Sequence, residues 1–283
     1  MNQKRILYED NDIIVCHKPA GIATQTAGVG QADMVSEITN YLAMTTKGNA
    51  AGHSTGNKAR RTTGSSLYVG VAHRLDQPVE GILVFAKNRH AAAELSRQIK
   101  ENRMEKYYYA VVCGQEFEPD GVLTDYLLKD GKSNTSRIVP SEVKGAKKAI
   151  LDYRIVTRTA YMKETGTESS HSIALAEIRL HTGRHHQIRV QMSHAGMSLL
   201  GDYKYGDAET IAISERMHIQ EIALCAYKLS FFHPRTGQQL QFKTSIAFGY
   251  EGYFYITDVT APVIFSDGQY KLGDVAGMVY LGD

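Results

Sequence analysis

The 283-residue sequence has few cysteines, no long apolar segment and almost no net charge. Its three cysteines, Cys16, Cys113 and Cys225, are far apart and form no CxxC pair. This argues against a zinc site or a redox motif and predicts three reduced, buried thiols. The N-terminus lacks an apolar stretch of signal-peptide length, and no run of about 18 apolar residues occurs elsewhere. The sequence therefore predicts a cytoplasmic protein that neither enters the secretory route nor spans a membrane.

The overall charge does not identify a partner. The chain has 32 Lys plus Arg and 30 Asp plus Glu, a formal net charge of +2. This balance neither requires nor excludes nucleic acid, because phosphate is attracted by a local basic patch rather than by the total charge. With 43% hydrophobic and 22% charged residues, the chain can bury a sizeable core, which excludes the disordered class. The length fits one large domain or two small ones.

Hydrophobic periodicity predicts many short strands and few helices. Strands are expected at 6–15 (a hairpin around an acidic turn), 67–72, 81–86, 106–114, 121–128, 149–156, 172–180 and 225–232. Helices are expected at 31–46, at 89–104 and from a turn at Thr182 and Gly183 onward. Because strands outnumber helices without a regular βαβ alternation, the expected fold class is α+β, with a mixed, mostly antiparallel sheet flanked by helices and loops.

Residues 45–66 form a basic segment rich in Gly, Ser, Thr and Asn, with Arg60 and Arg61 among its cations and no acidic residue. Two interpretations remain open: a solvated insertion, or a flexible arm that grips a polyanion. Beyond about residue 249 the pattern becomes less regular. We expect one main domain over 1–248 that contains the basic segment, followed by a C-terminal extension over 249–283.

Segment 172–194 carries the strongest local signal. Its strand is followed by a turn and a helix that bring Arg184 and Arg189 close to a helix N-terminus. Backbone N–H groups at that end add partial positive charge to the side chains. Such a place favours a carboxylate or a phosphate, although a surface ion-pair network is the usual explanation for any single arginine.

A metal site is not expected in this segment. His181 and His185 lie four residues apart, but no HExxH motif is present. Neither a carboxylate nor a cysteine stands at ligand spacing. We expect the histidines to form hydrogen bonds or to face a ligand.

Two further features allow both a structural and a functional interpretation. Asp76 lies in HRLD between two predicted strands and is followed by Pro78, so it is either a turn acceptor or a reactive carboxylate. Tyr108 lies between Tyr107 and Tyr109, and alternation along a strand places it on the face opposite to both. The tyrosines serve either sheet packing or stacking with a nucleobase. Spacing alone does not decide between these alternatives.

The order of the motifs points to a family. HRLD, GILVFAK, KYYYAVVCG, LHTGRHHQIRVQ and GDYKYG follow one another, and VCHKPAG and LCAYKLSFFHPRTGQQLQF extend the match to about residues 6–245. The chain resembles the RluA-type pseudouridine synthases. The resemblance implies a pseudouridine synthase fold with an active-site cleft, in which uridine of RNA is isomerised to pseudouridine without a metal or an organic cofactor. The basic segment and the tail lie outside it.

The resemblance also implies roles for individual residues. Asp76 is expected to be the catalytic carboxylate, either attacking the sugar or removing a proton from it. Arg189, the second arginine of TGRxxQIR, is expected to keep Asp76 ionised, and Tyr108 of KxYxAxV is expected to lie against the target uracil. Contacts with RNA are expected from Lys18, Arg60, Arg61, Arg74, Arg184 and His185.

The chain departs from the common family pattern at a few positions. Val79 and Glu80 stand where Thr and Ser usually follow HRLDxx, and His185 replaces a Thr or Ser. Activity is still expected, and the expected effect of Glu80 is on local electrostatics and target choice. A separate N-terminal S4-like domain is not expected. The expected partner is structured ribosomal or transfer RNA, with neither a membrane nor an obligatory protein partner.

Two rival functions remain. The fold could be retained as an RNA-binding or assembly module, in which case Asp76→Asn would leave the cellular role intact. A hydrolase using Asp76 with one of the histidines would release free uracil. Conversion of uridine without a change in mass and without release of a base would exclude the hydrolase.

Overall fold

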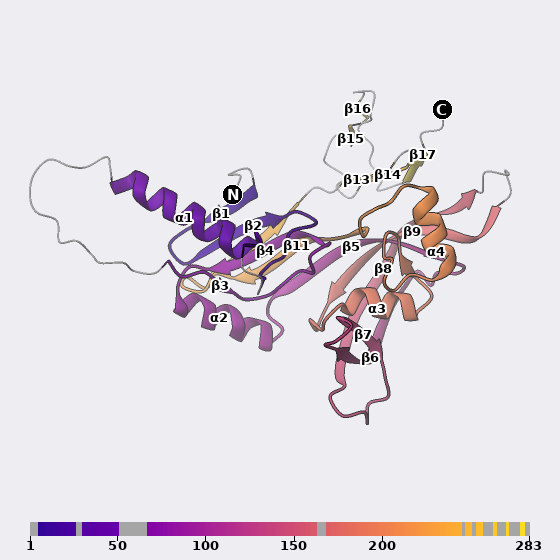
Figure 1. Cartoon of the computed structure of the whole chain (residues 1–283), viewed down its shortest axis with the longest axis horizontal. Coiled ribbons are helices and arrows are strands. Elements are labelled where there is room, and N and C mark those ends of the chain that lie inside the picture. Colours follow the sequence, from indigo (N-terminus) through magenta and orange to yellow (C-terminus); the bar gives the residue numbers. More distant parts are fainter. Residues whose placement is uncertain are drawn as a thin grey trace, which may run out of the picture. The chain divides into compact units, whose positions relative to one another are not determined.

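The chain forms two compact units in the computed structural model (Figure 1). The structure describes residues 5–26, 30–50, 67–162, 168–244, 247–250, 253–256, 263–264, 270–271 and 278–280. The first unit consists of residues 1–104 and 230–242, and the second of residues 105–229 and 243–283. The expected boundary between residues 248 and 249 stays a prediction.

The first unit is built on antiparallel strands near the N-terminus. Its neighbouring strands are β1 (Ile6–Glu9), β2 (Ile13–Lys18) and β4 (Glu80–Ala86), and β4 also pairs with β3 (Gly70–Val71). Nearly all side chains of β2 and β4 are buried, as in strands that are covered on both faces. The predicted hairpin over 6–15 and the strand over 81–86 are confirmed. Of the strand predicted over 67–72, only β3 is extended and paired.

Helix α1 (Met34–Ala50) buries Met34, Ile38 and Leu42 in the first unit. The sequence-based end of this helix at Thr46 was wrong, because the helical backbone continues to residue 50. The first residues of the basic segment 45–66 are therefore helical. Their Gly and Thr content is typical of a loop, but helix propensity is only a weak preference.

Helix α2 (Arg89–Lys100) shows the apolar stripe that its sequence predicts, but it ends four residues before the predicted residue 104. Asn88 precedes it and accepts a hydrogen bond from the Ala91 N–H at 2.9 Å. Ala91 and Leu95 are fully buried. The amide of Gln98 exchanges two hydrogen bonds of 2.8 Å with the backbone of Phe232, which ties the helix to the returning chain.

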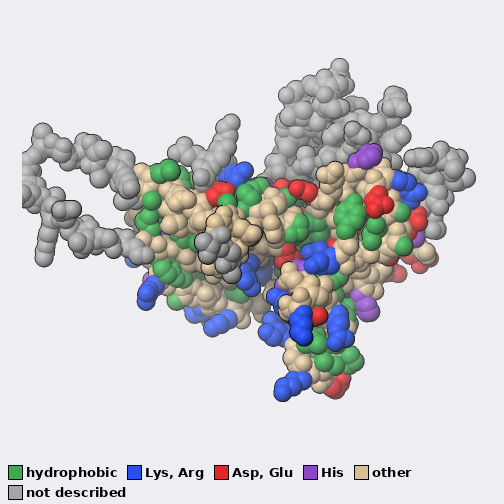
Figure 2. All heavy atoms as spheres, in the orientation of Figure 1, with side chains coloured by type: hydrophobic (Ala, Val, Ile, Leu, Met, Phe, Trp, Pro, Cys, Tyr) green, Lys and Arg blue, Asp and Glu red, His purple; other side chains and the backbone are tan. Residues whose placement is uncertain are grey.

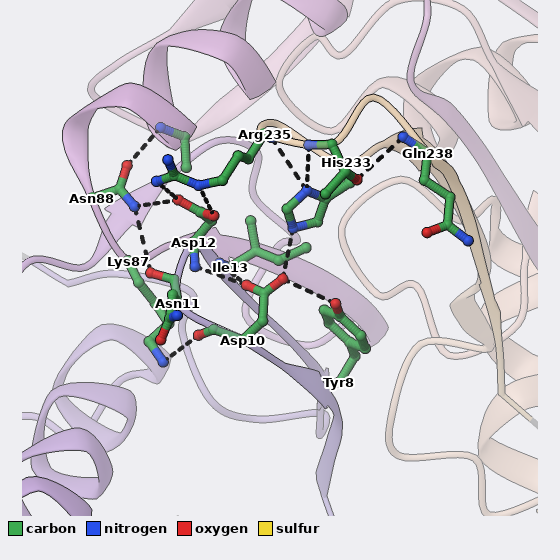
Figure 3. A network of polar contacts seen from close by, with 12 residues as sticks. Tyr8, Asp10, Asn11, Asp12, Ile13, Lys87, Asn88, His233, Arg235 and Gln238 are labelled. Carbon is green, nitrogen blue, oxygen red and sulfur yellow. Dashed lines mark hydrogen bonds and ion pairs between the residues drawn. The ribbon is translucent and has the colours of Figure 1, made fainter.

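A polar network joins parts of the first unit that lie 223 positions apart in the sequence (Figure 3). We call its four central residues, Asp10, Asp12, His233 and Arg235, the N-terminal clasp. Arg235 donates from Nε and Nη2 to the two carboxylate oxygens of Asp12, both at 2.6 Å. His233 Nδ1 accepts backbone N–H groups of its own turn, so Nε2 carries the proton that it donates to Asp10 at 2.6 Å.

The clasp is a structural feature rather than a metal site. Ligand atoms of Asp10, Asp12 and His233 lie within 4.8 Å of one another, as they would around a metal ion. Each of these atoms, however, already takes part in hydrogen bonds within the protein. Hydrogen bonds from Arg235 lower the pKa of Asp12 to about 2. The clasp therefore fixes the N-terminal hairpin to the chain that follows β11 (Leu224–Phe232).

The second unit is built on a longer antiparallel sheet. In spatial order its strands are β5 (Glu105–Gly114), β9 (Glu168–Leu180), β8 (Lys147–Met162), β6 (Asp120–Asp130) and β7 (Thr135–Ile138). Strand β10 (Ser198–Leu199) pairs with β5. The start of β11 also belongs to this unit and lies next to β5.

Helices α3 (Gln187–His194) and α4 (Ala208–Arg216) complete the second unit. Val111, Leu175 and Ile213 contribute to its main hydrophobic core, together with Cys113 and Cys225. All three cysteines of the chain are free and buried, which confirms the prediction. Burial raises the pKa of Cys16 and Cys113 to about 12.

Shorter strands lie toward the C-terminus. They are β12 (Gln239–Lys243), β13 (Ala247–Tyr250), β14 (Tyr253–Ile256), β15 (Val263–Ile264), β16 (Tyr270–Lys271) and β17 (Met278–Tyr280). Strands β13, β14 and β17 form one small antiparallel sheet, and β15 pairs with β16. The predicted α+β class is confirmed. Among the described residues, no helix has the length and hydropathy needed to cross a bilayer.

Candidate active site

Asp76 lies on a loop whose backbone is fixed on its N-terminal side. Thr24 Oγ1 donates to the Leu75 carbonyl at 2.9 Å and accepts from the Leu75 N–H at 3.1 Å. Leu75 is buried, whereas Asp76 itself is half-buried. The Asp76 carbonyl accepts from the Val79 N–H at 3.1 Å, which closes the following turn. The loop thus presents Asp76 from a backbone anchored directly before it.

Lys18 fixes the same loop from its C-terminal side. Its side chain is fully buried, and its ammonium donates to the carbonyl oxygens of Pro19 (3.0 Å), Ile22 (2.6 Å) and Gln77 (3.0 Å). The Gly21 N–H also donates to the Gln77 carbonyl at 3.0 Å. The expectation that Lys18 contacts RNA directly needs correction, because an enclosed ammonium with three carbonyl partners has no surface to offer. Its visible role is to hold the loop of Asp76.

His73 and Arg74, the first two residues of HRLD, differ in their surroundings. His73 Nε2 accepts from the Val84 N–H of β4 at 3.3 Å, so this nitrogen carries no proton. Arg74 is exposed. Its expected contact with RNA stays a prediction.

Strand β5 places its three consecutive tyrosines on two faces, as the alternation predicts. The Tyr109 ring packs against Tyr227 with ring centroids 4.0 Å apart, and the Lys228 ammonium lies 3.6 Å from the centroid of Tyr107. Tyr108 points to the opposite face and is only 6% exposed. That face is the one on which the uracil contact of Tyr108 is expected.

Arg189 lies in the first turn of α3 and is held by a carboxylate that the sequence analysis missed. Its Nε and Nη2 donate to the two oxygens of Asp202, both at 2.7 Å. The guanidinium lies 5.0 Å from the ring centroid of Tyr205. The two side chains of the ion pair are 8% and 1% exposed. Of the five N–H groups of the guanidinium, this pair uses two, and its plane is fixed by the bidentate geometry.

The turn that carries Asp202 explains the GDYKYG motif. Asp202 Oδ1 also accepts from the backbone N–H groups of Lys204 at 3.1 Å and Tyr205 at 3.2 Å. Gly201 has a φ of +73°, and a Cβ there would lie 2.0 Å from the Glu221 carbonyl oxygen, so only glycine fits. The motif therefore shapes a turn that presents a carboxylate to Arg189. The position of GDYKYG shortly after the arginine motif in the sequence was the available signal for Asp202.

His186 hydrogen-bonds to Tyr205, the residue whose ring lies beside the Arg189 guanidinium. Tyr205 Oη accepts from the Ser136 N–H at 2.8 Å, and its own proton is therefore available for His186 Nδ1 at 2.7 Å. Burial and then the charge of Arg189 lower the pKa of His186 to about 3. His186 is thus a neutral residue that accepts at Nδ1. It precedes α3 with a left-handed φ of 53°.

The start of α3 differs from the prediction. The helix begins at Gln187 rather than at Thr182 and Gly183. The Gln187 amide oxygen accepts from Thr182 Oγ1 at 2.8 Å and from the Arg184 N–H at 2.9 Å. The preceding turn is therefore a separate element, stabilised by the first side chain of the helix.

His185 links this turn to β7 and to the turn before it. It stacks on His186 with centroids 3.7 Å apart, and its ring nitrogens hydrogen-bond to Ser136 at 2.9 Å and Asn134 at 3.1 Å. His181 instead pairs with Asp152 at 2.6 Å. Within the described part of the chain, the group with metal-like spacing is in the clasp and includes neither His181 nor His185.

Arg184 belongs to an exposed basic face on the second unit. Its Nε donates to the Lys148 carbonyl at 2.8 Å, and the Lys204 ammonium donates to the Asn134 carbonyl at 3.2 Å. We use the name basic face for the exposed side chains of Lys129, Lys132, Arg137, Lys148, Arg184 and Lys204. Figure 2 shows Lys and Arg side chains gathered over the part of this unit that contains β6 and β7. Arg60 and Arg61 lie outside the described residues.

The predicted catalytic residues are therefore divided between the units. Asp76 belongs to the first unit, whereas Tyr108 and Arg189 belong to the second. The expected pairing of Asp76 with Arg189 stays a prediction. What the structure adds is how each residue is held within its own unit.

Comparisons with known proteins agree with these motifs. A family model described as RNA pseudouridylate synthase matches residues 12–194. The chain is 33% identical over 255 residues to an uncharacterized RNA pseudouridine synthase of Chlorobaculum parvum, covering 85% of this chain and 70% of that protein. It is 32% identical to ribosomal large subunit pseudouridine synthase D of Zymomonas mobilis, with 84% and 67% covered. Against tRNA pseudouridine synthase C of Vibrio parahaemolyticus the identity is 29%, with 85% and 89% covered.

Solved structures share the fold. Human RNA pseudouridylate synthase domain containing 4 superimposes with a TM-score of 0.59 at 20% identity, covering 85% of this chain and 88% of that one. Human RNA pseudouridylate synthase domain containing 1 gives a TM-score of 0.58 at 20% identity, with 84% and 82% covered. These similarities show that the expected fold is present.

Proposed function

The chain belongs to the RNA pseudouridylate synthase family of isomerases, and on that premise we propose that it modifies uridines in structured ribosomal or transfer RNA, with Asp76 as the catalytic carboxylate. The observation that carries the proposal is the loop of Asp76, which Thr24 and Lys18 anchor on either side of the carboxylate. Relatives named for tRNA and for the large ribosomal subunit support the substrate class.

The reaction needs a carboxylate held in place. The bond from ribose to a ring nitrogen of uracil breaks, a bond to a ring carbon forms, and a proton moves from that carbon to the nitrogen. Asp76 acts on the ribose, as nucleophile or as base. An anchored backbone lowers the cost of bringing the carboxylate to the sugar, because its geometry is fixed before RNA binds. Mass is unchanged throughout the reaction, and no redox partner is consumed.

Arg189 supplies the positive charge. A carboxylate covered by bound RNA loses solvation, which raises its pKa unless a cation favours the charged form. Asp202 fixes the plane of the Arg189 guanidinium through two hydrogen bonds. We assign the positive charge of Arg189 to the stabilisation of ionised Asp76 or of the negative charge that develops on the substrate.

Tyr108 and the exposed arginines complete the proposal. Tyr108 provides an aromatic face for the extruded uracil, since stacking offsets part of the cost of leaving the helix. Arg74 and Arg184 are exposed and contact the RNA backbone, with Arg60, Arg61 and the basic face extending that contact. His185 borders this surface and is the position at which the chain departs from the common motif.

The test is a comparison of cells with and without the gene. Pseudouridines are mapped across ribosomal and transfer RNA by an adduct-stop assay, and the gene is restored as wild type, Asp76→Asn or Asp120→Asn. Asp120 is an exposed aspartate of β6 and serves as the matched control. The proposal expects one or more sites to disappear without the gene, to return with wild type and Asp120→Asn, and to stay absent with Asp76→Asn.

Two outcomes would contradict the proposal. Restoration of the sites by Asp76→Asn would remove Asp76 from the catalytic role. Release of free uracil from RNA by the purified protein would favour a hydrolase over an isomerase.

A further inference from the structure

Lys106 is a largely buried lysine for which the reaction described above has no use. It is 9% exposed and lies on β5 two positions before Tyr108. Side chains two apart on a strand share a face and lie about 7 Å apart. Lys106 and Tyr108 therefore point to the same side of the second unit.

The tip of Lys106 lies beside the turn that precedes α3. A Cβ placed on Gly183 would be 3.8 Å from the Lys106 ammonium. Gly183 directly precedes Arg184, which is exposed. The ammonium is thus located between the face of Tyr108 and a turn that already presents a cation to solvent.

Other enclosed cations of the chain have acceptors. Lys18 donates to three carbonyl oxygens, and Arg189 donates twice to Asp202. For Lys106, no hydrogen bond or ion pair is found within the part of the chain that the structure describes. Burial lowers the pKa of its ammonium.

The ammonium is not completely enclosed by the protein. Among the described residues, the fully enclosed side-chain nitrogen and oxygen atoms without a partner belong to Glu37, Gln191 and Thr210. Lys106 Nζ is not one of them, and the residue keeps 9% of its surface exposed. A largely buried ammonium without an acceptor destabilises the folded protein, and an anionic group of a bound ligand would offset this cost.

We propose that Lys106 binds a phosphate group of the RNA next to the nucleotide whose uracil lies on Tyr108. The inference rests on the proposed function. Tyr108 and Lys106 are spaced along one face much as a base and a nearby phosphate are spaced in a nucleotide chain. A phosphate there neutralises the Lys106 charge, for which no acceptor is found among the described residues. Lys106 is therefore a positioning residue that places the target nucleotide for Asp76.

The test uses the full chain with Lys106→Met and Lys106→Arg, and with Lys228→Met as the matched control. Lys228 lies over the Tyr107 ring on the opposite face of β5, and burial lowers its pKa as well. The probe is bulk ribosomal and transfer RNA from cells that lack the gene. Binding is measured over a range of salt concentrations, and pseudouridine formation gives kcat and KM.

The proposal expects Lys106→Met to raise KM about 10-fold, with kcat changed less than about 3-fold, since a phosphate contact mainly serves binding. The slope of log affinity against log salt should become shallower by about 1. Lys106→Arg should retain most of the affinity, and Lys228→Met should match wild type. The melting temperature of Lys106→Met should stay unchanged or rise, whereas Lys18→Met should lower it.

Other outcomes overturn the inference. An unchanged KM and salt slope in Lys106→Met would show that Lys106 makes no contact with a phosphate of the RNA. A fall in melting temperature in parallel with lost affinity would indicate a structural role. If wild type binds RNA but forms no pseudouridine, the proposed function fails, while the salt slope still decides whether Lys106 binds phosphate.

Discussion

Each unit of the protein contains an aspartate that binds an arginine through two hydrogen bonds near a histidine. The two pairs differ in how deeply the arginine is buried. In the N-terminal clasp, the Asp12 side chain is 4% exposed and that of Arg235 is 63% exposed. In the second unit, Arg189 and Asp202 are 8% and 1% exposed. The first pair leaves its cation in solvent, whereas the second encloses both partners.

This difference separates a structural tie from a functional support. Arg235 satisfies a buried carboxylate and joins distant segments, and nothing further is required of it. Asp202 instead fixes a guanidinium that is enclosed in an environment of low dielectric constant. Hydrogen bonds and charges are stronger in such an environment. Loss of the second pair should therefore affect both stability and activity, and loss of the first should affect stability alone.

Asp202→Ala should have the largest effect. It leaves Arg189 enclosed without its carboxylate, which is expected to cost about 3–5 kcal/mol of unfolding free energy. Misplacement of the guanidinium should also lower pseudouridine formation by about 100-fold. Denaturant unfolding and single-turnover conversion measure the two effects.

Asp207→Ala is a matched control for this variant. Asp207 lies in the same unit and caps α4 by accepting from the Thr210 N–H at 2.8 Å. Its loss should cost about 1 kcal/mol, the usual value for an N-cap, and leave conversion unchanged. Equal effects of the two variants on activity would contradict a specific role for Asp202.

His186→Asn tests the second network through pH. The pKa of His186 in the folded protein is about 3, well below the ordinary value of about 6.5. The stability that the neutral ring provides is complete above pH 6.5 and is lost as pH falls from there toward 3. Asparagine tolerates the left-handed backbone but does not titrate, so the stability difference between wild type and variant should shrink over this range. A difference that stays constant with pH would contradict a neutral, buried His186.

Asp12→Asn should have the smallest effect on the reaction: it should lower stability at neutral pH, and this difference should disappear in acid. The pKa of Asp12 is lowered from its ordinary value of 3.8 to about 2 by Arg235. Its contribution is complete above pH 4 and is lost as pH falls through about 2. Melting temperatures between pH 5 and 2 should converge for wild type and variant, with activity equal at neutral pH. A loss of activity at neutral pH would show that the clasp supports the reaction.

Much of the fold follows from local sequence patterns. The hairpin over 6–15, the strand over 81–86 and the apolar stripe of α2 all depend on neighbouring residues, and these were predicted correctly. The end of α1 and the start of α3 were not. The first depends on how far helical hydrogen bonds continue past the apolar stripe, and the second on the Gln187 side chain bonding back to its own turn.

The site was predicted less completely, because its supports come from contacts distant in sequence. Lys18 looked like a surface cation, since composition does not reveal that the Gln77 carbonyl, 59 positions away, meets its ammonium. Asp202 and Arg189 each lay within a motif, but no local pattern showed that they pair. Whether Lys106 has an acceptor depends on how distant segments pack around it, and no local sequence pattern indicates this.

The central claim is that Asp76 performs the chemistry while its anchored loop and the basic side chains position the RNA. The most direct test is single-turnover conversion of bound RNA by Asp76→Asn, at a protein concentration that saturates binding. We predict that the variant binds with an affinity within about 3-fold of wild type, since replacing the carboxylate by an amide of the same shape removes no phosphate contact. We also predict that it forms no pseudouridine. Conversion at the wild-type rate by fully bound Asp76→Asn would contradict the account.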